Sequence, residues 1–148
     1  MSTHPYLRAY LAGVFIPTLI LPLMLTAFIV LRLMLQVSIP IERGLVFPMS
    51  LVPILWGLWN VLWLGTHPRT HLALGVHGAL LPILLLPCGA FVARSSGVVA
   101  FGTSHITWFS AIHLPYWLIA IGFCCGVAVY YLVWKYIVGF LNAVLGLA

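Results

Sequence analysis

The feature that most constrains this chain is a long apolar run from Ala9 to Leu35, which only a few polar residues interrupt. About 20 apolar residues cross the hydrocarbon core of a bilayer as a helix, so this run is long enough for one tilted helix. It is also too long for the apolar region of a cleaved signal peptide, and we expect it to remain as a membrane helix. Over its 148 residues the chain is 64% hydrophobic and 5% charged, a composition typical of an integral membrane protein.

Three further apolar runs predict an all-α fold, an antiparallel bundle of four transmembrane helices in a single membrane domain of residues 1–148. We place the helices at residues 9–35, 46–64, 71–93 and 115–136. The turn at Thr66 to Thr70 is short, so the second and third helices should be antiparallel neighbours. The apolar extension 137–148 exceeds the length of one bilayer core, and we expect it to lie along the membrane surface or pack against a partner.

The connection 95–113 mixes glycine and polar residues with large apolar ones. This mixture predicts an interfacial segment in the headgroup region, partly helical from about Ser104. The aromatic residues and Lys135 between Tyr130 and Tyr136 are typical of a membrane edge.

Each of the first three predicted helices contains two prolines five residues apart: Pro17 and Pro22, Pro48 and Pro53, Pro82 and Pro87. A proline inside a helix leaves a backbone carbonyl without its usual partner, so we expect kinked helices. The common spacing has two explanations, chance among proline-rich membrane helices or an internal repeat of the kind found in transporters.

We call side A the side of the N-terminus, of the Thr66 to Thr70 turn and of Tyr130, and side B the side of Glu42 and Arg94. The six basic residues divide equally between them: Arg8, Arg69 and Lys135 on side A, and Arg32, Arg43 and Arg94 on side B. The distribution of positive charge therefore hardly decides the orientation. The weakly charged long connection favours cytoplasmic termini and a location in the cell (inner) membrane.

The charged residues also exclude several functions. The bases stand singly at the ends of apolar runs, where they suit lipid phosphates rather than nucleic acid. Glu42 is the one carboxylate side chain, so the chain cannot supply a pair of catalytic carboxylates or a membrane-buried acid. Cys88, Cys124 and Cys125 all fall in apolar runs and are interpreted as small buried hydrophobic residues.

Asn60 and His77 are the most polar side chains predicted to lie well inside the membrane. Counted from the turn, they should lie at equal depth, where they could hydrogen-bond to each other. Trp56 and Trp63 share a helix stripe with Asn60, and Trp59 flanks it. We predict either a pocket for a quinone, an isoprenoid or a lipid at these five residues, or simple helix packing through the same groups.

Other polar groups give weaker signals. His67 and His71 are four residues apart, but the proline between them argues against a shared helix face, so we predict no metal site. His77 has no histidine at similar depth on another predicted helix to hold a haem, and we expect no cofactor.

Gly122 and Gly126 have the small-xxx-small spacing that lets helices pack closely. Together with the apolar extension, they predict a homo-oligomer or a subunit of a larger membrane complex. We therefore hold three hypotheses: a non-enzymatic accessory or packing subunit, a binder of a hydrophobic small molecule, and an oligomeric channel or transporter. The expected partners are the lipid bilayer, other protein subunits and a hydrophobic small molecule, and not nucleic acid.

Overall fold

The computed structural model describes residues 4–36, 42 and 46–147. This part of the chain contains four helices that are long and apolar enough to cross a membrane: Pro5–Met34, Pro48–Thr70, Leu74–Ser95 and Tyr116–Val144. The prediction of a helical bundle with four long apolar helices is confirmed. Most of the predicted first loop, residues 36–44, and the last residue of the predicted extension lie outside the described residues.

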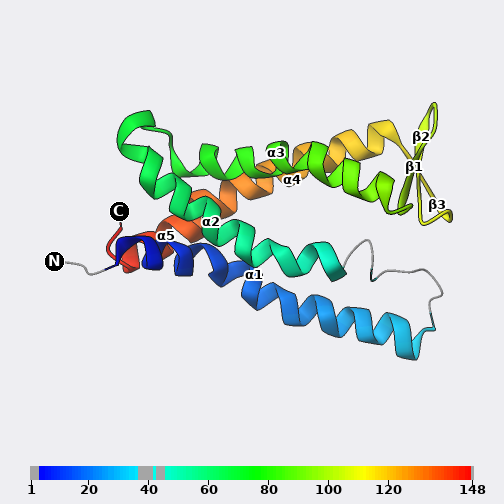
Figure 1. Ribbon diagram of the computed structural model, residues 1–148, viewed down its shortest axis with the longest axis horizontal. Helices are drawn as coiled ribbons and strands as arrows, with labels where there is room; N and C mark the ends of the chain where they lie inside the picture. The colour runs from blue at the N-terminus through cyan, green and yellow to red at the C-terminus, as the bar shows by residue number, and fades with distance from the viewer. Residues whose placement is uncertain (1–3, 37–41, 43–45, 148) are drawn as a thin grey trace.

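The first helix, α1 (Pro5–Ile29), continues into the π-helical turn η1 (Val30–Met34). The next two helices are α2 (Phe47–Thr70) and α3 (Leu74–Ser95). The last is continuous through α4 (Tyr116–Leu132), the π-helical η3 (Val133–Val138) and α5 (Gly139–Val144). The chain runs back and forth along the long axis, and its termini lie at one end (Figure 1). We keep the name side A for this end and side B for the opposite end.

The link between α2 and α3 is shorter than predicted, because α2 continues through residues 66–70. Thr66 Oγ1 donates a hydrogen bond to the Leu62 carbonyl (2.8 Å), and Pro68 is accommodated within the helix. The helix ends at Thr70, and the cap residue His71 has a left-handed backbone (φ 50°) and donates its N–H to the His67 carbonyl (2.9 Å). Three residues, 71–73, then complete the hairpin.

A small three-stranded antiparallel sheet at side B replaces the helix expected from about Ser104. Its strands are β1 (Val99–Phe101), β2 (His105–Trp108) and β3 (Ile112–Pro115), paired in chain order. The tight β2–β3 turn depends on two residues in the left-handed region, Phe109 (φ 53°) and Ser110 (φ 58°). The four-residue turn between β1 and β2 is closed by a hydrogen bond from Gly102 N to His105 O (3.0 Å).

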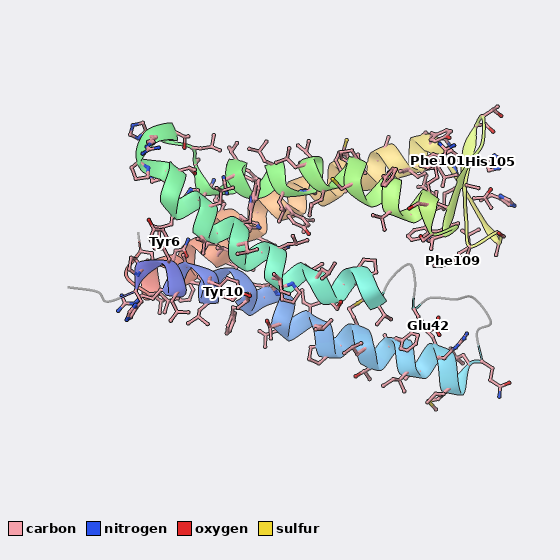
Figure 2. All side chains as sticks on the ribbon, in the orientation of Figure 1. Tyr6, Tyr10, Glu42, Phe101, His105 and Phe109 are labelled. Atoms are coloured by element: carbon pink, nitrogen blue, oxygen red, sulfur yellow. The ribbon has the colours of Figure 1, made fainter. Side chains whose placement is uncertain are left out.

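Glycines bring α1 and α2 into close contact near side A. A Cβ atom added at Gly13 would lie 2.5 Å from the Trp56 carbonyl oxygen and 2.9 Å from Gly57 Cα. The Tyr10 ring, labelled in Figure 2, occupies the corresponding space beside Gly57. The two helix backbones are in direct contact here, so no flexible side chain could move aside for an added Cβ. This close crossing therefore requires glycine at position 13.

One face of the C-terminal part of the last helix packs against the other helices, whereas residues 137–148 were predicted to lie along the membrane surface or pack against a partner. Trp134 and Val138 are fully buried in a core with Trp56 and Leu81. A Cβ atom at Gly78 of α3 would overlap the Trp134 side chain, so the glycine provides the space for the indole. Arg8 on α1 then holds the end of the helix through a hydrogen bond from Nη1 to the Leu145 carbonyl (3.0 Å).

Replacing Gly13 with alanine should destabilise the fold by about 1–3 kcal/mol, because the added methyl group collides with the α2 backbone. The matched control is Gly65→Ala on α2, where an added Cβ meets no atom within 4 Å. That change should be neutral or slightly stabilising, since alanine is the better helix former. Thermal unfolding in detergent measures both, and equal melting temperatures for the two variants would contradict the close α1–α2 crossing.

Candidate functional site

Asn60 lies at a junction of three elements. Its Nδ2 donates to the Ala9 carbonyl of α1 (2.8 Å) and to Oδ1 of Asn142 in α5 (2.8 Å). Asn142 Nδ2 donates in return to Asn60 Oδ1 (3.2 Å). Both asparagine side chains have an exposed fraction of 0%, so the two amides satisfy each other away from solvent.

His77 forms a second reciprocal pair, with Trp59 rather than with Asn60. His77 Nε2 donates to the Trp59 carbonyl (3.0 Å), and Trp59 Nε1 donates to the His77 carbonyl (2.8 Å). The two rings stack at a centroid distance of 4.6 Å. The imidazole is therefore fixed on the flank of α2, about 100° around the helix from Asn60.

The remaining predicted site residues are also bonded within the chain. Trp56 Nε1 donates to the Tyr130 hydroxyl (3.3 Å) and Trp63 Nε1 to the Leu72 carbonyl (3.3 Å). The structure thus brings all five predicted residues into one aromatic and polar region of the bundle. Their polar groups are used between helices, so this geometry favours packing over a ligand pocket.

Histidines elsewhere do not assemble a metal centre. The rings of His67 and His71 have a centroid distance of 6.5 Å, and His67 Nδ1 is hydrogen-bonded to the Leu72 carbonyl (3.2 Å). Within residues 4–36, 42 and 46–147, no group of three or more His, Cys, Asp or Glu side chains could hold a metal ion.

A cavity of about 450 Å³ lies away from the predicted residues, in the side B half of the molecule. Its walls are α2 from Pro48 to Leu55, α3 from Leu85 to Ala93 with the cap residue Ser96, and the sheet region at Val98, Val99 and Trp108. Nearly all of these side chains are apolar. Among the described residues, the buried indole N–H of Trp108 has no hydrogen-bond partner.

A smaller cavity of about 230 Å³ lies on the other side of α2, against α1 and α4. Trp56 and Tyr130 line it, and of the five predicted site residues Trp56 alone borders either of these two cavities of the described residues. Val52 borders both cavities and separates them. The side B half of α2 therefore borders a cavity on two of its faces.

Sequence reasoning missed the larger cavity because its lining has the composition of any membrane helix. Gly89 lines this cavity, and an added Cβ there would meet no atom of the described residues within 4 Å. Cys88, Cys124 and Cys125, all expected to be buried, are instead exposed, Cys88 at the cavity wall. Gly122 and Gly126 also have no atom within 4 Å of an added Cβ, so they support no packing within this chain.

Comparison of the chain with known protein families, curated proteins and solved structures finds no match. The function must therefore be inferred from the geometry of the chain itself.

Replacing Asn60 with leucine should destabilise the protein by about 0.5–2 kcal/mol, because the Asn142 amide stays buried without its partner. Asn142→Leu should cost a similar amount for the same reason. The double variant should cost clearly less than the sum, since removing both partners leaves no unsatisfied amide. Thermal unfolding of the four proteins in one detergent measures this coupling, and strictly additive losses would show that the two amides act independently.

Proposed function

We propose that this chain is an integral membrane protein whose four helices span the bilayer in antiparallel order, and that it binds a lipid-like molecule without catalysing a reaction. The site is the larger cavity between α2 and α3. The class of occupant is an amphipathic hydrophobic molecule, such as a lipid, an isoprenoid or a quinone.

The membrane setting is supported by what the helices expose. The helices expose large apolar side chains along their outer faces, including Leu23, Leu33 and Phe91 with exposed fractions of 70%, 72% and 73%. Water would oppose so much exposed apolar surface, whereas lipid chains would cover it. The four helices are also individually long enough to cross the hydrocarbon core.

The cavity is the observation that carries the binding function. Its volume of about 450 Å³ falls in the range of ordinary small-molecule sites, and its walls are almost wholly apolar. The sheet covers its side B end through Val98, Val99 and Trp108. An occupant of matching chemistry would therefore enter from the bilayer rather than from water.

Replacing Gly89 with phenylalanine should fill the cavity and remove a bound hydrophobic molecule from the purified protein. The control is Gly65→Phe, an exposed glycine of α2 outside the cavity where an added Cβ also finds open space. Mass spectrometry of extracts from detergent-purified protein measures the amount of bound molecule. We expect about a tenfold reduction for Gly89→Phe, equivalent to about 1.4 kcal/mol of binding energy, and little change for the control. Equal retention by both variants would remove the cavity as the site.

A second candidate function, a packing subunit of a homo-oligomer or larger complex, is favoured by the surface of α4. Gly122 and Gly126 lie one turn apart on this helix with open space beside them, and close packing of a second helix would use that space.

Leucine at both Gly122 and Gly126 should then shift the protein from oligomer to monomer, because the side chains hold neighbouring backbones apart. Native mass spectrometry in detergent reads the oligomeric state directly. A wild-type protein that is monomeric, or an oligomer that the double substitution leaves intact, would rule out this glycine surface as the contact.

A further inference from the structure

We propose that the smaller cavity, between α1, α2 and α4, binds a compact hydrophobic carbonyl compound whose oxygen accepts a hydrogen bond from the Tyr130 hydroxyl. A quinone ring is the kind of molecule that fits. This site is separate from the larger cavity and does not depend on the binding function proposed there. It adds a second ligand and the residue that recognises it.

Trp56 and Tyr130 line this cavity towards its side A end. From Trp56 the α2 wall continues through Val52 to Met49, about one and two turns nearer side B. Helices α2 and α4 both begin at side B (Figure 1). Because side chains on a helix lean towards its N-terminus, both aromatic rings lean towards side B, the direction in which the α2 wall of the cavity continues.

The Tyr130 hydroxyl has a hydrogen left to donate. Trp56 Nε1, which can only donate, lies 3.3 Å from the Tyr130 oxygen, so the phenol is the acceptor in this bond. In the described part of the chain, the hydroxyl donates to no acceptor of its own. The contact with Trp56 places the hydroxyl between α4 and α2, which form two of the cavity walls. An acceptor inside the cavity would complete its hydrogen bonding.

The rest of the lining selects a carbonyl compound over water. Apart from Trp56 and Tyr130, the side chains around the cavity are apolar. A buried water typically makes about three hydrogen bonds, and these side chains offer it one donor. A carbonyl oxygen only accepts, and the apolar body that carries it would be covered by the lining. A cavity of about 150 Å³ accepts benzene, and this one, at about 230 Å³, has room for a substituted ring.

Titration calorimetry of the detergent-purified protein tests this with two matched probes: duroquinone, and durene, which has the same ring and methyl groups without the oxygens. Tyr130→Phe removes only the hydroxyl and should weaken duroquinone binding about fivefold, the usual net value of one neutral hydrogen bond. Durene binding should hardly change. The control is Tyr131→Phe, which removes the neighbouring hydroxyl outside the cavity and should leave both affinities intact.

A second variant tests the cavity itself. Val129→Phe adds a ring at the cavity wall and should weaken binding of both probes, since it takes up the space they need. The proposal is overturned if the wild type does not bind duroquinone, or if Tyr130→Phe and Tyr131→Phe have equal effects on its binding.

The larger cavity is separated from this site by Gly89→Phe, which should leave duroquinone binding intact. If Gly89→Phe removes duroquinone and Val129→Phe does not, the quinone lies in the larger cavity; the proposed function then stands and the inference about Tyr130 is wrong. If duroquinone binding depends on Tyr130 but the larger cavity retains no molecule, the inference stands and the proposed function is wrong.

Ethyl octanoate distinguishes two sources of the carbonyl group, because it carries the group on a flexible chain rather than a ring. A loss in Tyr130→Phe that is confined to duroquinone supports the proposal with a quinone-type ring as the occupant. An equal loss for ethyl octanoate supports it with the ester of a lipid chain.

Discussion

Two buried amides tie together parts of the chain that are far apart in sequence. Asn60 of α2 reaches Ala9 of α1 and Asn142 of α5, and its amide hydrogens find acceptors only when both partners are in place. In the hydrocarbon of the proposed membrane, no water could substitute for a missing partner. The junction therefore sets the height of α1 and α5 relative to α2, and the seating of Trp134 against Gly78 follows from the position of the last helix.

The same organisation explains why the two ends of the molecule differ. The hydrogen bonds that we describe from α2 to α3 and to the link before it involve Trp59, Trp63, His67 and His77, all towards side A. Towards side B the facing surfaces of these helices are apolar and enclose the larger cavity. A bundle anchored by polar contacts at one end can leave space at the other without losing its register. The cavity is thus compatible with a stable fold.

Much of this arrangement was predictable, and the failures have physical causes. Hydropathy places the four helices well, because a long apolar run has few alternatives. Counting from the hairpin turn places Asn60 opposite His77, yet the structure puts Trp59 there, since depth along a helix does not determine rotation about it. The sheet was missed because its turns use Phe109 and Ser110 with positive φ, for which the sequence gives no glycine signal. The burial of Asn142 was missed because its partner lies 82 residues away.

The position of Trp134, Val138 and Asn142 in the chain has a consequence for biosynthesis. These fully buried side chains are synthesised after the first three helices. Until that segment is made, Asn60 lacks its amide partner and the groove beside Gly78 has no indole to fill it. In the proposed membrane, the first three helices can insert one after another, but their final packing has to wait until the fourth helix is made. Until the fourth helix is in place, a nascent chain would consist of inserted, incompletely assembled helices, the stage at which membrane chaperones and quality-control proteases can act on exposed polar groups.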